Sequence, residues 1–261
     1  LFRSGSGKTE SFLLPLFAQL AKEFANWQTP HAKSTTVNTW WKEGADGGLT
    51  PTQIVNTSNF TLSNATRQRQ HERRKAGVRA LILYPMNALV EDQMSRLRKA
   101  LDSDDTRNWL NTSGNSNAIY FGRYNSSSPV AGELKKLKED GTTTINTKKV
   151  NQLKEQLQQL ETDSNRVAQY IQATGKTGSE AKDLKSFFQR LDGAEMRSRF
   201  DMQVAPPDIL ITNYSMLSIM LMRDIDKGIF DETKQWLTCE DLQPEQRESE
   251  KTNRIFHLII D

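Results

Sequence analysis

A glycine-rich segment near the start of the chain has the residue types of a phosphate-binding loop. The segment reads Gly5-Ser6-Gly7-Lys8-Thr9, and an apolar run follows it. In such a loop, backbone N–H groups close around a polyphosphate, and the N-terminus of the next helix adds a favourable dipole. The lysine lies against the outer phosphates, and the threonine hydroxyl ligates Mg²⁺. We therefore expect Gly5, Ser6, Gly7, Lys8 and Thr9 to bind a nucleotide together with Mg²⁺.

This segment departs from the full loop pattern at one position. The full pattern has another glycine five residues before Gly7, where this chain has Phe2. A bulky side chain there would crowd the turn, and one hypothesis is that residues are absent near Ser4 and Gly5. A glycine-rich helix cap without a ligand is the alternative interpretation of the segment.

A second Gly-Lys-Thr, residues 175–177, has the same three residue types in a different context. No predicted strand precedes it, and it follows a polar helical segment. Glycine is common just past the C-terminal end of a helix, because it adopts the left-handed conformation there at little cost. We therefore interpret this segment as a helix-ending turn and reject it as a phosphate site.

The composition limits the class of protein. The chain has 261 residues and a formal net charge of +3 at pH 7, which permits nucleic acid as a partner without requiring it. The single cysteine, Cys239, excludes an internal disulfide framework and fits a reducing compartment. The three histidines lie far apart and have no metal-ligand spacing. Because no apolar run approaches about 20 residues, we expect no transmembrane helix.

Four short apolar segments predict the strands of a mostly parallel sheet. They are residues 80–84, 118–121, 208–211 and 256–260. Short uninterrupted apolar runs are typical of strands buried on both faces, and their alternation with helices indicates an α/β domain. A helix is predicted over 8–25, and another follows Asn87, with an apolar stripe formed by Leu89, Val90, Met94 and Leu97. Ligands of such sheets bind at the carboxyl ends of the strands.

Two polar stretches, at about 26–77 and 125–200, are predicted to be insertions into this domain. The first ends in a basic segment, Arg67 to Arg79, which we interpret either as a solvated helix or as a phosphate-contacting patch. The second contains apolar residues at alternating three- and four-residue steps over 150–171, which predict an amphipathic helix. That helix either packs on its own domain or docks a partner protein.

The order of the short motifs resembles the first RecA-like domain of superfamily 2 helicases. After the glycine-rich loop, Pro85-Met86-Asn87-Ala88-Leu89-Val90-Glu91-Asp92-Gln93 is similar to motif Ia, and Thr212-Asn213-Tyr214-Ser215-Met216-Leu217 is similar to motif Ib. Phe121-Gly122-Arg123 lies between them, and Asp261 is similar to the first residue of the Asp-Glu-x-His box, motif II. Residues 79–98, 121–130 and 206–237 are also similar to the helicase subunit of DISARM, a bacterial anti-phage defence system.

This resemblance implies the fold, the activity and the partners. The fold would be an α/β RecA-like P-loop domain over 1–261, ending at motif II, with a mostly helical insertion. The intact protein would be an ATP-dependent helicase in which Lys8, Thr9 and Asp261 act in ATP hydrolysis and Thr9 and Asp261 hold Mg²⁺. It would act on single- or double-stranded DNA without sequence preference, in the cytoplasm, together with a partner subunit of the defence system.

Six residues after the predicted strands are candidates for nucleic-acid contacts, and each has an alternative structural role. They are Pro85, Met86, Asn87, Arg123, Thr212 and Asn213. Helix N-termini and small polar side chains there would contact phosphates, which fixes position without reading bases. The alternatives are a helix cap for Asn87, a surface salt bridge for Arg123 and a strand-to-helix turn for Thr212 and Asn213.

Other functions remain open at this point. An RNA-directed motor has the same motifs, and a nucleotide-gated DNA-binding scaffold would need no unwinding. A P-loop phosphotransferase is disfavoured, because that function would not account for the motif-like segments after residues 84 and 211. This chain alone is expected to hydrolyse ATP poorly or not at all, because it stops before the motif II glutamate and lacks a second motor domain.

Overall fold

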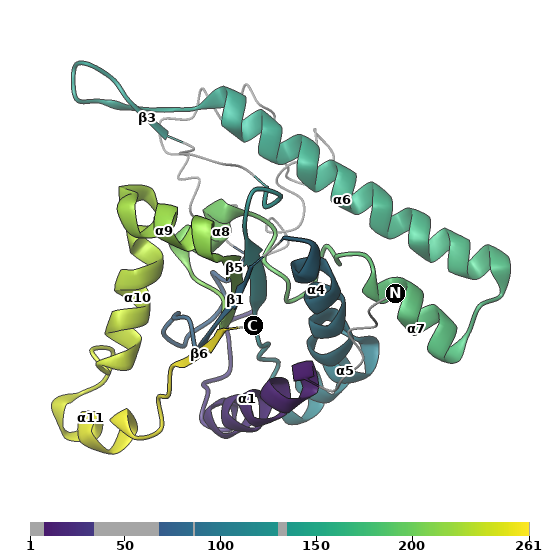
Figure 1. The fold of residues 1–261 in the computed structure, drawn as a ribbon, viewed down its shortest axis with the longest axis horizontal. Helices are drawn as coiled ribbons and strands as arrows, with labels where there is room; N and C mark the ends of the chain where they lie inside the picture. The colour runs from purple at the N-terminus through teal and green to yellow at the C-terminus, as the bar shows by residue number, and fades with distance from the viewer. Residues whose placement is uncertain (1–7, 34–67, 86, 130–134, 261) are drawn as a thin grey trace.

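A four-stranded parallel sheet lies at the centre of the molecule (Figure 1). The computed structural model describes residues 8–33, 68–85, 87–129 and 135–260. In spatial order the strands are β2 (Phe121–Tyr124), β5 (Ile209–Asn213), β1 (Ala80–Tyr84) and β6 (His257–Ile260). Each neighbouring pair is parallel. The predicted α/β class with a mostly parallel sheet is confirmed.

Helices cover both faces of this sheet, with α4 and α5 on one side and α8, α9 and α10 on the other (Figure 1). The helices before residue 120 are α1 (Lys8–Phe24), α4 (Asn87–Leu101) and α5 (Asp104–Ser113). Those after it are α6 (Thr147–Thr174), α7 (Gly178–Ser186), α8 (Arg199–Val204), α9 (Tyr214–Met222), α10 (Lys227–Leu237) and α11 (Pro244–Lys251), with a 3₁₀ turn, η2, at Asp224–Asp226. Among the described residues, no helix is both long and apolar enough to cross a membrane.

The apolar stripes of α1 and α4 build much of the core. On α4, Val90, Met94 and Leu97 follow one another at helical spacing and are almost completely buried. Leu89 was predicted to belong to this stripe, but it is 37% exposed because it faces away from the sheet. On α1, the residues that reach the core are Leu13, Leu16, Leu20 and Phe24. The helix positions of the chemistry-bearing residues are therefore set by packing against the sheet.

The second and third strands were predicted too early in the chain, and β2 runs on to Tyr124, so Arg123 lies inside it. The second strand begins at Phe121, not Ala118, because the backbone of Tyr120 is held by Asp208: its N–H donates to Asp208 Oδ2 over 2.7 Å, and its carbonyl accepts from the N–H of Asp208. The third strand extends past its apolar run to Asn213, since pairing with β1 continues to that residue.

The second insertion is largely helical: α6 leads into α7, which packs against α4. α6 continues without a break through its middle and buries Val150, Leu153 and Leu157 in its first half. An antiparallel pair, β3 (Lys135–Leu137) and β4 (Thr143–Ile145), precedes it. Gly175 caps α6 in the left-handed conformation, with φ of 63°, which confirms the helix-ending turn.

The predicted insertions include residues that pack into the domain. Trp27, Ala194 and Met196 belong to the core cluster, and Glu195 forms an isolated bridge with Phe121. The tandem tryptophans at 40 and 41 lie outside the described residues. The polar stretches are therefore peripheral only in part.

Over residues 68–79 the basic segment is not a solvated helix, and three of its arginines form a buried ionic cluster, whereas Arg73 is exposed and Arg67 lies outside the described residues. Asp208 lies 2.6 Å from Arg74, 3.0 Å from Arg79 and 3.7 Å from Arg69, and the side chains of all four are almost fully buried. Against the effect of burial, the three guanidinium groups hold the pKa of Asp208 well below its usual range. These arginines join the strands at their amino ends and are not available to phosphates.

Candidate nucleotide and nucleic-acid site

The carboxyl edge of the sheet brings the ends of three predicted strands together. In the parallel register, Tyr84 pairs with Asn213 and Leu83 pairs with Ile260. Pro85 follows Tyr84 directly, and β6 ends one residue before Asp261. The ends of β1, β5 and β6 are therefore neighbours at one edge, which is where ligands of parallel α/β sheets bind.

The described part of the phosphate-loop segment is the start of α1. This helix begins at Lys8, so the glycine-rich residues precede its N-terminus, as the loop pattern requires. Gly5, Ser6, Gly7 and Asp261 lie outside the described residues, as does the side chain of Lys8. Thr9 is therefore the first residue of the predicted nucleotide site whose side chain the structure describes.

Thr9 has the chemistry of a metal ligand in this position. It is 8% exposed, and its hydroxyl oxygen accepts a hydrogen bond from Gln93 Nε2 over 3.1 Å. A hydroxyl oxygen has two lone pairs, so one remains for a cation. Hydroxyl and carboxylate oxygens are ligands that Mg²⁺ accepts, usually with several waters. The residue therefore fits the predicted Mg²⁺ site.

A second contact joins α1 and α4 near the same place. Arg96 donates to Glu10 over 2.6 Å and to Asp92, on its own helix, over 3.0 Å. The side chains of these residues are between about one-third and three-fifths exposed, so this ion pair is weak in water. The helix after the phosphate loop and the helix after β1 thus touch twice, once at a buried contact and once at the surface.

The residues after β1 lead into the N-terminus of α4. Pro85 is exposed, Met86 lies outside the described residues, and Asn87 is the first residue of the helix. The side chain of Asn87 is outside the described part, so its predicted capping bond stays a prediction. The first backbone N–H groups of a helix have no partner within the helix, so the N-terminus of α4 is a candidate phosphate contact.

Thr212 is not available to nucleic acid through its side chain. It lies inside β5, is fully buried, and its hydroxyl donates to the carbonyl of Tyr124 over 2.6 Å. Thr212 was a surface candidate because the strand was predicted to end at Ile211. The sheet register shows that β5 continues to Asn213. Asn213 lies at the end of β5, and its Oδ1 accepts from the N–H of Met216 over 2.7 Å, which caps α9.

Arg123 forms an ion pair with Glu91 of α4. Its side chain is 22% exposed, whereas that of Glu91 is 53% exposed. This is the surface salt bridge that the sequence left as an alternative, and a phosphate would have to compete with the carboxylate for the guanidinium. The pair also joins β2 to α4, close to the carboxyl edge.

Sequence reasoning quoted Gln93 within its motif but gave it no role. The contact with Thr9 joins residues 84 positions apart, so no local pattern contains it. The available signal was a polar residue directly before Met94 on the buried side of an amphipathic helix, since a buried amide requires a hydrogen-bonding partner.

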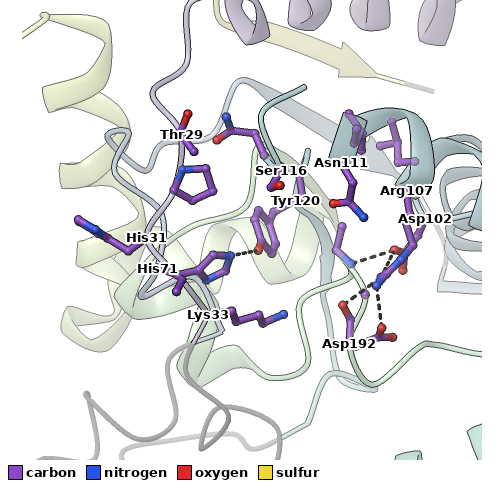
Figure 2. A pocket seen from close by; sticks show the side chains of 18 residues that line it. Thr29, His31, Lys33, His71, Asp102, Arg107, Asn111, Ser116, Tyr120 and Asp192 are labelled. Atoms are coloured by element: carbon purple, nitrogen blue, oxygen red, sulfur yellow. Dashed lines mark hydrogen bonds and ion pairs between the residues drawn. The ribbon is translucent and has the colours of Figure 1, made fainter. Parts of the chain in front are cut away.

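A cavity of about 400 Å³ lies at the opposite, amino edge of the sheet (Figure 2). Tyr120 just before β2 and Asp102 just after α4 line it, and the Tyr120 hydroxyl lies 3.3 Å from Nε2 of His71. Burial lowers the pKa of His71 to about 4, and burial together with Arg197 lowers the pKa of Lys33 to about 8. The predicted site residues that the structure describes do not line this cavity.

The comparisons with known proteins fit this arrangement. The model of the DEAD/DEAH box helicase family matches residues 2–154, more than half of the chain. The Druantia protein DruE of Escherichia coli (strain UMEA 4076-1) is 28% identical, over 92% of this chain and 12% of that relative, so the chain spans a small part of its length. No solved structure matches the chain. The parallel sheet, the helix that begins at Lys8 and the family match together assign the chain: it belongs to the DEAD/DEAH box helicase family.

Proposed function

We propose that this chain is the nucleotide-binding motor domain of an ATP-dependent DNA helicase or translocase. The observation that carries the proposal is the shared carboxyl edge. The ends of β1, β5 and β6 lie side by side there, with Tyr84 opposite Asn213 and Leu83 opposite Ile260. The family match supports an ATP-hydrolysing helicase as the general class.

The nucleotide half of the proposal uses the loop before α1. Backbone N–H groups of Gly5, Ser6 and Gly7 and the amine of Lys8 would hold the phosphates. Thr9 and Asp261 would hold Mg²⁺, directly or through water. When bound, Mg²⁺-ATP supplies the phosphoanhydride bond whose hydrolysis drives the motor. The chain itself binds and orients this group and neutralises its negative charge.

The nucleic-acid half uses the segment that follows β1 and residues at the carboxyl ends of β2 and β5. Pro85, Met86 and Asn87 place the N-terminus of α4 beside a phosphate, Asn213 places the start of α9 nearby, and Arg123 adds a cation once Glu91 is displaced. Thr212 makes no proposed phosphate contact through its buried hydroxyl. It supports the surface only as part of β5, next to Asn213. Such contacts predict sequence-independent binding that weakens as salt is raised.

The cellular role is proposed from sequence resemblance. Three stretches resemble the helicase subunit of the DISARM anti-phage system, and the curated relative is a bacterial Druantia protein rather than a DISARM subunit. We therefore propose bacterial anti-phage defence, in the cytoplasm, with a partner subunit of the same system. The choice of DISARM itself depends on residues 79–98, 121–130 and 206–237.

A strand-displacement assay with the full-length protein tests this proposal. Tailed DNA duplexes and RNA duplexes of the same sequence are incubated with ATP or with a non-hydrolysable analogue, and a DNA triplex reports translocation without unwinding. We expect displacement of a DNA strand or of the triplex strand, with ATP only. Nucleotide-dependent DNA binding without either displacement would indicate a scaffold, and activity on RNA alone would indicate an RNA-directed motor.

A further inference from the structure

Gln93 on α4 contacts the hydroxyl group that the proposed site assigns to Mg²⁺. Its Nε2 donates to Thr9 Oγ1 over 3.1 Å. The two residues are 7% and 8% exposed, so water has little access to the bond. A buried hydrogen bond of this kind holds both side chains in one arrangement, because breaking it would leave polar groups without partners.

The bond leaves Thr9 with the capacity that a metal ligand requires. A hydroxyl oxygen has two lone pairs, and the amide of Gln93 uses one of them. The other lone pair remains for a cation. Since threonine is branched at Cβ and has few χ1 states, one additional bond is enough to fix the direction of the hydroxyl. A ligand oriented before binding loses less conformational freedom when the ion arrives.

The position of Gln93 on α4 connects this hydroxyl to the nucleic-acid surface. α4 begins at Asn87, six residues earlier, which is about 9 Å along a helix axis. Val90 and Met94 anchor the intervening turns in the core. The ion pair between Arg96 and Glu10 adds a second, exposed contact between the two helices. One helix therefore has a candidate phosphate contact at its start and, six residues later, a contact to Thr9 of the proposed nucleotide site.

We propose that Gln93 is a positioning residue. It orients the Thr9 hydroxyl for the Mg²⁺ of a bound nucleotide, and it makes α4 the element shared by the nucleotide and nucleic-acid surfaces. The inference rests on the proposed function, since it takes Thr9 to face a nucleotide. It adds a residue and a route of communication that the predicted site did not contain.

Equilibrium binding of a fluorescent, non-hydrolysable ATP analogue to the full-length protein tests the positioning role. Affinity is measured with MgCl₂ and with EDTA, and the ratio gives the gain due to the metal. Gln93→Met keeps the length of the side chain and removes the donor. We expect it to lower the gain roughly 3- to 10-fold, the worth of one hydrogen bond, and to leave the affinity in EDTA unchanged. Arg96→Ala, which removes only the exposed contact, should keep the wild-type gain.

A double variant separates positioning from packing. In a Thr9→Val background no hydroxyl remains to be oriented, so adding Gln93→Met should change the Mg²⁺ gain no further. A Gln93→Met protein with the wild-type gain would overturn the proposal. An equal loss of affinity in EDTA would overturn it as well, since it would show a packing role; circular dichroism and a thermal melt establish that each variant is folded.

Nucleic acid provides the second readout, for the shared role of α4. The affinity for the analogue is measured with and without single-stranded DNA, and the ratio of the two values gives the coupling between the sites. We expect this ratio to differ from one in the wild type and to move towards one in Gln93→Met. An unchanged ratio would overturn the communication through Gln93. If the wild-type protein binds no nucleotide under any condition, the proposed function itself is refuted, which is a result distinct from failure of this inference.

Discussion

Replacing Asp208 by asparagine should strongly destabilise the domain. The carboxylate accepts from Arg74 over 2.6 and 2.8 Å and from the N–H of Tyr120 over 2.7 Å, and it lies 3.0 Å from Arg79. The Asp208→Asn side chain keeps the volume but removes the charge. Breaking a buried ion pair by removing one partner costs about 3–5 kcal/mol, because the remaining charge stays buried without compensation. After Asp208→Asn, Arg74 and Arg79 would keep ion pairs with Glu72 and Glu23, whereas Arg69 would lose its ion pair with Asp208.

Asp208 is the ionic partner that Arg69, Arg74 and Arg79 share, whereas Glu72 pairs with Arg74 and Glu23 with Arg79. Arg69 is fully buried, and its Nε has no hydrogen-bond partner among the described residues. Burial lowers the pKa of Arg69, whereas for Arg74 the carboxylates of Asp208 and Glu72 more than offset burial and raise the pKa. Since a domain is stable by only about 5–15 kcal/mol, we expect Asp208→Asn to lose a large part of the free energy of unfolding.

Urea denaturation followed by circular dichroism measures this loss. The matched control is Asp92→Asn, which breaks an exposed pair with Arg96 and should cost less than about 1 kcal/mol. The pH dependence gives a second check. Because the pKa of folded Asp208 is depressed, its contribution is present above the ordinary carboxyl pKa, about 4, and is lost as the pH falls below it. An Asp208→Asn protein within about 1 kcal/mol of the wild type would refute the reasoning.

Two further predictions concern buried groups away from the proposed site. Glu195→Gln should destabilise the domain by about 3–5 kcal/mol in the same urea assay, because Arg98 donates to both carboxylate oxygens, over 2.6 and 2.9 Å, in a buried place; a change below about 1 kcal/mol would contradict this. The free energy of unfolding should also fall as the pH drops from 6.5 to about 4, since burial lowers the pKa of His71 to about 4 and the unfolded chain takes up a proton that the folded residue does not. His71→Gln should flatten that part of the pH profile, and an unchanged slope would show that other groups cause it.

The elements that were predictable are those with a local signal. The apolar run 80–84 is β1, and the predicted helix over 8–25 is α1 to within one residue at its C-terminal end. The glycine at 175 was interpreted as a helix end, and its left-handed backbone confirms that. In each case the residues that determine the structure lie within a few positions of one another, so the sequence pattern contains the cause.

The features that sequence reasoning missed depend on residues far apart in the chain. Arg74 belongs to a basic segment whose local pattern allows a solvated helix, but its buried partner Asp208 is 134 positions away. Thr212 followed an apolar run and was placed beyond the strand, whereas pairing with β1 and β2 keeps it inside. The bond between Gln93 and Thr9 spans 84 positions. Ionic partners, strand register and contacts between helices are set by the tertiary fold, which composition and periodicity do not contain.

The central claim is that the first Gly-Lys-Thr holds the nucleotide of a DNA motor, and the chain contains its own control for that claim. Lys8 begins α1 behind the glycine-rich loop, whereas Lys176 has the same two neighbours but follows the end of α6 and pairs with Glu180 over 3.0 Å at the surface. The decisive measurement is ATP hydrolysis by the full-length protein, with and without single-stranded DNA, for the wild type, Lys8→Ala and Lys176→Ala. The account predicts DNA-stimulated hydrolysis that Lys8→Ala abolishes and Lys176→Ala leaves intact. Hydrolysis that survives Lys8→Ala, or nucleotide binding that DNA never stimulates to turnover, would contradict it.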